Sequence, residues 1–276
     1  MYKLWLFDFD NTIARLEPEV DWAGGRPVLE RYLRSVGAPD ELFERIRRGN
    51  LPLYDAYRTL MLANSKHPNK AEQPTEAKKQ KHPIDTTATR LSPSPQGKGL
   101  ESTMRLSPFP YGKGLGVRFA RITNNLRQAS DLIEEIELEG VDRAQPLEGA
   151  VETIAALKKR GAAIAIVTSN SSRTVSRWFQ NHGTTSADAI IGRDTLLGLK
   201  PAPDMLIRAL EIFSIDSSES AFVGDSEADL QAAQTCSIQF YGIAPNERAR
   251  NRLLAASATE IFASPSALAI HLNLLR

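Results

Sequence analysis

The sequence of 276 residues predicts an α/β protein built on a doubly wound, Rossmann-like parallel sheet. Short apolar runs alternate with helix-like segments through the second half of the chain, an order typical of parallel sheets covered by helices on both faces. The runs at 4–7, 163–167 and 221–223 each end in polar residues. Because ligands of such folds bind at the carboxyl ends of strands, these endings indicate where a site lies.

The remaining elements follow in order. Further strands are expected at 189–191, 238–241 and 260–262, and helices at 151–159, 173–181, 204–213, 227–235 and 264–275. Four more helices are expected before this region, at 27–36, 39–48, 53–63 and 122–138. The third of these, for example, places Leu53, Tyr57 and Leu60 at helical spacing.

Composition indicates a protein that acts in the cytoplasm. Hydrophobic residues make up 42% and charged residues 24% of the chain, enough for one full core and a smaller unit. The only cysteine is Cys236, so no disulfide can form within the chain and a reducing compartment is expected. No apolar stretch approaches the roughly 20 residues of a membrane span, and the first strand begins too early to leave room for a signal peptide. We therefore expect no membrane partner.

The formal charge of +1 is unevenly distributed. Residues 66–119 contain ten Lys/Arg and four Asp/Glu, a net of +6, which leaves −5 for the remainder. A basic tract can bind nucleic acid, but these charges are mixed with seven of the sixteen prolines and follow neither a helical nor a strand period. We interpret 66–119 as a disordered insertion and expect no nucleic-acid partner.

The insertion contains an internal repeat. Residues 90–100 recur as 105–115, and the two copies differ only at the pairs 94/109 and 96/111. Two copies of this length cannot stack into a core. Their Gly-Lys-Gly triplets lack the spacing of a phosphate-binding loop and neither follow a strand nor open a helix, so the repeat predicts no function.

Two carboxylates follow the first strand, Asp8 and Asp10, in the stretch Asp-Phe-Asp-Asn-Thr. At a strand end such a pair can lie near one metal ion and divide the roles of nucleophile and acid/base. An acidic turn that only solvates the end of the sheet is the alternative. The motif alone does not decide between them.

Three later segments add chemistry in a consistent order. Thr168, Ser169 and Asn170 end the second apolar run and can hold phosphate oxygens, although such a run is also typical of a helix N-cap. Lys200 precedes two prolines, where a lysine can equally be a solvated surface charge. Finally, Asp225 ends another strand run, and Asp229 falls in the first turn of the next helix, where it could simply complement the helix dipole.

Together these four segments resemble the haloacid dehalogenase-like hydrolase superfamily, over roughly residues 1–15 and 147–245. The resemblance implies that Asp8 is the phosphoryl-accepting nucleophile and Asp10 the general acid/base. Thr168 and Lys200 would be catalytic residues that also bind the phosphate, with Ser169 and Asn170 beside them. A Mg²⁺ ion would be held by Asp8, the backbone carbonyl of Asp10, Asp225 and Asp229.

The four early helices resemble the helical cap inserted after the first strand in the phosphoglycolate phosphatase-like and beta-phosphoglucomutase-like branches. The implied organisation is a catalytic core at 1–15 and 147–276, a cap at 16–65 and 120–146, and the insertion at 66–119. A cap of this kind closes over the site and excludes water. It would admit only small substrates.

The implied function is Mg²⁺-dependent hydrolysis of a small phosphorylated metabolite through an aspartyl-phosphate. The acid at position 10 argues against dehalogenation, since a halide needs no proton. Cleavage of phosphonates through a cap lysine is disfavoured because Lys66 and Lys70 lie in or beside the expected disorder. A sugar phosphomutase, a phospho-accepting receiver and a catalytically silent binding protein are the alternatives, of which chain length and strand order disfavour the receiver.

The substrate and the oligomeric state stay open. Four residues are positional candidates for substrate contact, each with an ordinary surface or packing explanation: Arg15, Glu17, Trp22 and Arg45.

Overall fold

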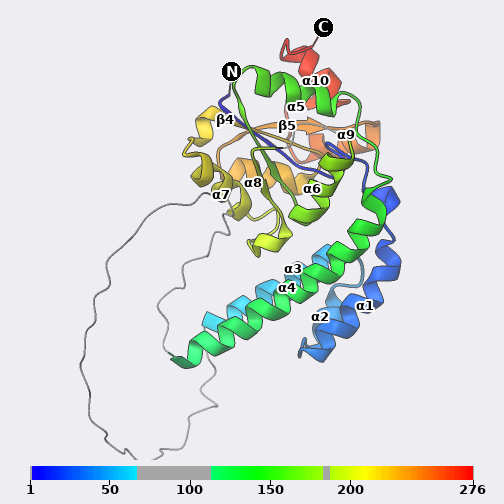
Figure 1. Cartoon of the computed structure of the whole chain (residues 1–276), viewed down its shortest axis with the longest axis vertical. Helices are drawn as coiled ribbons and strands as arrows, with labels where there is room; N and C mark the ends of the chain where they lie inside the picture. The colour runs from blue at the N-terminus through cyan, green and yellow to red at the C-terminus, as the bar shows by residue number, and fades with distance from the viewer. Residues whose placement is uncertain (1, 67–112, 183–186, 276) are drawn as a thin grey trace, which may run out of the picture.

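The computed structural model describes residues 2–66, 113–182 and 187–275. Its centre is a parallel sheet of six strands in the order β3-β2-β1-β4-β5-β6, which confirms the predicted fold class (Figure 1). The strands are β1 (Leu4–Phe7), β2 (Ala163–Val167), β3 (Ala189–Ile191), β4 (Ser220–Gly224), β5 (Gln239–Ile243) and β6 (Ile261–Phe262). Strand β1 lies between β2 and β4, with Leu4 opposite Ala163 and Ser220. The carboxyl ends of these three strands therefore meet at one edge.

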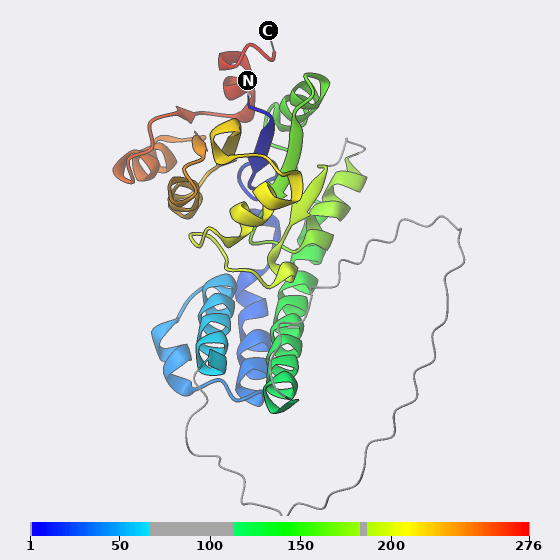
Figure 2. The same ribbon diagram turned by 90° about the vertical axis from the view of Figure 1, so that its left-hand side faces the viewer.

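Helices cover both faces of this sheet (Figure 2). They are α5 (Ala150–Lys159), α6 (Ser172–Asn181), α7 (Asp204–Phe213), α8 (Glu227–Thr235), α9 (Glu247–Ala255) and α10 (Pro265–His271), with single turns at η1 (Glu17–Glu19), η2 (Arg193–Thr195) and η3 (Ser217–Glu219). Helix α9 corrects the sequence analysis, which predicted no element at these residues. Asn246 accepts a hydrogen bond from the backbone N–H of Ala249 and starts this helix, a capping signal that the sequence already contained.

Alternation along the strands sorts the core into two halves. Leu4 and Leu6 of β1 pack with α7 on one face, whereas Trp5 and Phe7 pack with α5 and α6 on the other. All four side chains are buried. A strand with two buried faces reads as a continuous apolar run, which is why β1 was visible in the sequence.

The first four α-helices in the described part of the chain lie beyond the carboxyl edge of the sheet and pack side by side (Figure 2). They are α1 (Trp22–Ser35), α2 (Asp40–Arg45), α3 (Asn50–Lys66) and α4 (Lys113–Val141). Helix α1 begins earlier than the expected residue 27, because Asp21 caps it by accepting a hydrogen bond from the backbone N–H of Gly24, 2.8 Å away. We treat these helices as the cap proposed for 16–65 and 120–146.

The predicted insertion at 66–119 lies largely outside the described residues. Helix α3 reaches Lys66, and α4 begins at Lys113, within the range assigned to the insertion. Lys113 and Gly114 of the second Gly-Lys-Gly triplet therefore open a helix, contrary to the expectation for that triplet. Across 2–66, 113–182 and 187–275, no helix combines the length and apolar composition that a membrane span requires.

Candidate active site

The carboxyl ends of three central strands bring the predicted site residues together. Asp8 follows β1, and its backbone N–H donates to Val223 O of β4 at 2.8 Å. Thr168 follows β2, and Asp225 follows β4. All three line a cavity of about 420 Å³, together with Asp10, Ser169, Asn170 and Lys200. Residues that are far apart in the sequence thus share one space.

Lys200 lies at the centre of this charge arrangement. Its Nζ is 2.6 Å from Asp8 Oδ1 and 2.6 Å from Asp229 Oδ1, and it donates to Val167 O at 3.1 Å. Its side chain is only 5% exposed. Burial alone favours the neutral amine, but Asp229 and Asp8 outweigh it and raise the pKa of Lys200 above its usual value. The lysine is therefore a fixed cation inside the site.

Three carboxylates converge closely enough to share a cation. One oxygen from each of Asp8, Asp225 and Asp229 lies within 4.8 Å of the other two. Mg²⁺ prefers oxygen ligands and keeps several waters, and this donor set of carboxylates beside an open cavity fits it. The carboxyl of Asp10 is not in this group, and only its backbone carbonyl was assigned to the metal.

Burial raises the proton affinity of two of these acids, Asp8 and Asp225, and neighbouring carboxylates add to it. Burial raises the pKa of Asp8 to about 6, with Lys200 opposing and Asp229 adding to the shift. Burial, reinforced by Asp8 and Asp229, raises the pKa of Asp225 to about 8. Burial and neighbouring carboxylates disfavour the ionised forms of Asp8 and Asp225, and a bound cation would favour those forms. The electrostatics therefore also fit a metal site.

Asp10 is held apart from the other acids. Its Oδ1 accepts hydrogen bonds from the backbone N–H groups of Leu16 at 2.9 Å and Glu17 at 3.0 Å. Burial raises the pKa of Asp10 to about 7, against the opposing effect of these N–H donors and with a further contribution from Asp8. A carboxyl with a pKa near neutrality can give and take a proton at physiological pH.

The loop after β2 is tightly hydrogen-bonded within the protein. The Thr168 hydroxyl donates to Asn170 Oδ1 at 3.0 Å and accepts from Asn170 N at 3.2 Å. The side-chain amide of Asn170 donates to Glu137 Oε1 at 3.1 Å. Both ends of the Asn170 side chain therefore have protein partners. Ser171 caps α6, as the capping alternative for this run allowed.

Asp229 has two roles in this structure. Its Oδ2 accepts from Ser226 N at 3.1 Å and Ser226 Oγ at 2.6 Å, which forms a capping box at the start of α8. Its Oδ1 pairs with Lys200. Asp229 therefore does interact with the N-terminus of helix α8, as the sequence allowed, and this interaction fixes its carboxylate beside Lys200.

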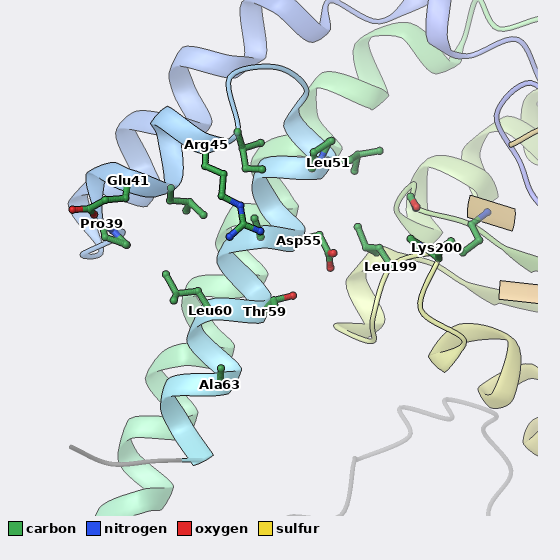
Figure 3. A pocket seen from close by; sticks show the side chains of 16 residues that line it. Pro39, Glu41, Arg45, Leu51, Asp55, Thr59, Leu60, Ala63, Leu199 and Lys200 are labelled. Atoms are coloured by element: carbon green, nitrogen blue, oxygen red, sulfur yellow. The ribbon is translucent and has the colours of Figure 1, made fainter. Parts of the chain in front are cut away.

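A larger cavity adjoins the first (Figure 3). It has a volume of about 750 Å³ and lies between α2, α3 and the loop at 199–201, and both cavities share Leu51, Ser169 and Lys200. Arg45 of α2 and Asp55 of α3 line it, and Asp55 faces Leu199 in Figure 3. The larger cavity thus extends from the lysine toward the helices.

The positional candidates divide between these spaces. Glu17 and Trp22 line the cavity that contains Asp8, and Arg45 lines the larger one. Arg15 is exposed and lines neither.

Sequence analysis missed Glu137 of α4 and Arg193 of η2. Their side chains are fully buried and form an ion pair of 2.7 Å behind the Thr168 loop. Glu137 stands among other acidic residues and Arg193 is followed directly by Asp194, so no local pattern marked either charge as buried.

The structure thus places an acidic site with a buried lysine at the carboxyl edge of a parallel α/β sheet. Sequence comparison finds a family that this chain resembles. The profile of the family described as haloacid dehalogenase-like hydrolase matches residues 112–243. Over those residues, a little under half of the chain, the sequence is similar to the haloacid dehalogenase-like hydrolase superfamily.

Among curated relatives, a phosphoglycolate phosphatase of Pseudomonas putida is 29% identical over 130 residues, covering 46% of this chain and 48% of the relative. The pyrophosphatase PpaX of Halalkalibacterium halodurans is 27% identical over 96 residues, covering 34% of this chain and 45% of the relative. The matches thus span less than half of either relative.

Solved structures match over nearly the whole chain. CbbY from Rhodobacter sphaeroides, in complex with phosphate, has a TM-score of 0.51 at 17% identity, covering 97% of this chain and 96% of the other. A hydrolase from Pseudomonas syringae has a TM-score of 0.51 at 16% identity, covering 99% of both chains. At this identity the likeness shows a shared fold.

Proposed function

We propose that the protein is a phosphatase that hydrolyses a small phosphorylated metabolite through an aspartyl-phosphate on Asp8. One observation carries the proposal. Lys200 Nζ lies 2.6 Å from Asp8 Oδ1 in a cavity that Asp10 and Thr168 also line. A carboxylate nucleophile, a fixed cation and an acid with a near-neutral pKa are the groups that phosphoryl transfer requires.

In the first step, an oxygen of Asp8 attacks phosphorus and the bond between phosphorus and the leaving oxygen breaks. Asp10 donates its proton to that oxygen, so the leaving group departs as an alcohol. Lys200 and the Thr168 hydroxyl, whose proton would turn from Asn170 Oδ1 to the substrate, would hold the phosphoryl oxygens. A dianion repels an attacking carboxylate, and the lysine offsets part of that repulsion.

In the second step, Asp10 is a carboxylate and takes a proton from a water molecule. The water oxygen attacks phosphorus, the bond to Asp8 breaks, and inorganic phosphate leaves. The pKa of Asp10, raised to about 7 by burial, suits both directions of transfer. A phosphomutase would instead return the phosphoryl group to a sugar.

We propose Mg²⁺ as the cofactor. Asp8, Asp225 and Asp229, with the backbone carbonyl of Asp10, would hold it. When bound, it would neutralise charge on the phosphoryl group beside Lys200. The convergence of three carboxylates, of which Asp8 and Asp229 are buried and Asp225 is half-buried, supports this assignment.

The leaving group would extend into the larger cavity bounded by α2 and α3, and residues 16–65 and 120–146 would act as the cap. Phosphoglycolate phosphatases among the relatives make a small phosphorylated acid a reasonable first substrate. We expect the protein to act in the cytoplasm.

The test is a screen of phosphorylated metabolites with purified protein and Mg²⁺, assayed by release of inorganic phosphate. Asp8→Asn in the same screen should abolish release, and mass spectrometry should find no phosphorylated enzyme. Full turnover by Asp8→Asn would contradict the covalent route. Isomerised sugar phosphate without release of phosphate would favour the mutase.

A further inference from the structure

We propose that Glu137 and Arg193 are positioning residues that hold the loop 168–171 in the geometry needed to bind a phosphoryl group. The proposal rests on the phosphatase function proposed above. Neither residue lines the cavity that contains Asp8. They would act through the loop that does.

The pair is buried and satisfied on several sides. Arg193 Nη1 lies 2.7 Å from Glu137 Oε1, and both side chains are 0% exposed. Arg193 also donates to Ser130 of α4, from Nε to Oγ at 3.2 Å and from Nη2 to the backbone carbonyl at 3.1 Å. Glu137 Oε2 accepts from the Thr174 hydroxyl of α6 at 2.9 Å. The two charges therefore join α4, η2 and α6 at one point.

The same pair contacts consecutive residues of the loop. Arg193 Nη1 donates to Ser169 O at 2.7 Å, and Arg193 N donates to Asn170 O at 2.9 Å. Glu137 Oε1 accepts from Asn170 Nδ2 at 3.1 Å, and its Oε2 accepts from Ser171 N at 3.0 Å. The backbone from 169 to 171 is thus fixed from two directions.

Asn170 transmits this restraint to the site. Its side chain bonds Glu137 through the amide nitrogen and Thr168 through the carbonyl oxygen. With Asn170 held by Glu137, the Thr168 side chain keeps one rotamer where it lines the cavity. When a phosphoryl group binds, only the hydroxyl proton turns from Asn170 Oδ1 to the substrate, while the Thr168 oxygen stays in place. Donor atoms that are already in position need little rearrangement when negative charge arrives, which is how positioning lowers a barrier.

The backbone N–H groups at the start of α6 are bonded to Glu137 and to Asp194, the residue after Arg193. Ser171 N bonds Glu137, and Ser172 N bonds Asp194 Oδ1 at 2.8 Å, so both N–H groups already have partners. Thr168 N and Asn170 N are also bonded, to Ile191 O at 3.1 Å and to Thr168 Oγ1 at 3.2 Å. In the stretch 168–172 this leaves the Ser169 N–H to hold a phosphate together with Lys200 and the Thr168 hydroxyl.

Stability alone is a weak reason for such a pair. Removing two charges from water is costly, and apolar replacements of buried ion pairs are often neutral or stabilising. Glu137 and Arg193 form directional hydrogen bonds with residues 169–171 and so fix the conformation of the loop. An apolar pair cannot form such bonds.

The test uses this difference. The double variant Glu137→Leu/Arg193→Met replaces both charges by apolar groups and leaves no unpaired buried charge. We expect it to fold, with kcat reduced at least tenfold and weaker binding of inorganic phosphate, measured by the Tm increase that phosphate causes. The single variant Glu137→Gln should lose kcat similarly, and its effect should not add to that of Asn170→Ala.

A second ion pair supplies the matched control. Arg173 Nη1 lies 3.2 Å from Glu134 Oε1 and joins the same helices, α6 and α4, without contacting the loop. The double variant Glu134→Leu/Arg173→Met should retain wild-type kcat and phosphate binding.

Wild-type kcat and phosphate binding in a folded Glu137→Leu/Arg193→Met protein would overturn the proposal while leaving the phosphatase function intact. Additive losses in Glu137→Gln and Asn170→Ala would overturn it as well. Should the double variant not fold, Asn170→Ala decides, since unchanged kcat and phosphate binding there would remove the link to Thr168. An inactive wild-type protein would refute the proposed function, and phosphate binding would still test the positioning.

Discussion

Lys200 Nζ and Asp229 Oδ1 lie 2.6 Å apart, with side-chain exposures of 5% and 0%. The sequence assigned the lysine to the phosphate and the aspartate to the metal shell. In the folded chain the two form one buried ion pair, and the lysine also contacts Asp8. The electrostatics of the nucleophile, the cation and the metal group are therefore coupled.

Replacing Lys200 tests this coupling. Lys200→Met leaves buried carboxylates without their cation, and losing one partner of a buried pair costs about 3–5 kcal/mol. We expect a loss of that size in the free energy of unfolding at pH 8 without metal, and a kcat reduced by at least about tenfold, since a lost charge interaction of 1.4 kcal/mol already gives that factor. Chemical denaturation and phosphate release measure the two effects.

Lys3→Met is the control, because Lys3 pairs with Glu219 at the surface, with exposures of 64% and 40%. Surface pairs contribute at most about 1 kcal/mol. A Lys200→Met protein as stable and active as Lys3→Met would contradict the central role of the buried lysine.

Asp10→Asn tests general acid/base catalysis. The variant retains the size of the side chain but cannot exchange the proton, so kcat should fall about 100- to 10,000-fold for an alkyl phosphate. An aryl phosphate with an acidic leaving group needs less protonation, so it should still phosphorylate Asp8 and accumulate phospho-enzyme. Rapid-quench kinetics compare the two substrates, and an unchanged kcat on the alkyl phosphate would rule out the assignment.

Metal binding should stabilise the protein most at high pH. Burial raises the folded pKa of Asp8 to about 6 and of Asp225 to about 8, above the value near 3.9 of an unfolded aspartate. Raised pKa values mean that the folded chain binds more protons, so this contribution to stability is full below about pH 4 and is lost as pH rises through 6 to 8. Mg²⁺ binds the ionised forms, so its effect on Tm should be larger at pH 8 than at pH 5.5.

The matched variant for this measurement is Asp225→Asn. It removes the charge of one proposed ligand and should lose most of the Tm increase caused by Mg²⁺. Equal Mg²⁺ effects at both pH values, or in both proteins, would count against the proposed metal site.

Gly192→Ala should disturb the loop after β2 from behind. A Cβ at Gly192 would lie 2.6 Å from Ser172 N and 2.8 Å from Asn170 O, so backbone must move. We expect a destabilisation of about 1–3 kcal/mol, typical of overpacking, together with a lower kcat/KM. Gly37→Asn is the control because nothing lies within 4 Å of its Cβ position and Asn tolerates its φ of +89°. Normal kinetics in Gly192→Ala would show that the loop geometry is not critical.

Removing residues 67–112 tests the proposed insertion. Helices α3 and α4 pack against each other, so a short Gly/Ser linker between Lys66 and Lys113 should preserve the cap. Loop length costs only about 0.6 kcal/mol per doubling, so the Tm should change little. Steady-state kinetics with the substrate found in the screen complete the test, and a tenfold loss of kcat/KM in a folded deletion would assign the segment a function.

The sequence by itself determined the sheet, most of the described helices and the resemblance to the superfamily. Local rules were sufficient there, because buried parallel strands appear as apolar runs and the acids at positions 8, 10 and 225 follow those runs directly. Among the helices of residues 2–66, 113–182 and 187–275, the one that was missed is α9, which is short and carries few apolar residues, although Asn246 marked its start.

Only the tertiary structure decided which charges meet. Lys200 and Asp8 are 192 residues apart in the chain, and Glu137 and Arg193 are 56 apart, so no local spacing relates either pair. Glu137 stands among other acidic residues on α4, and its burial follows from the packing of that helix against α6 and η2. Periodicity identifies the face of an element, whereas the partner of a buried charge depends on how separate elements pack.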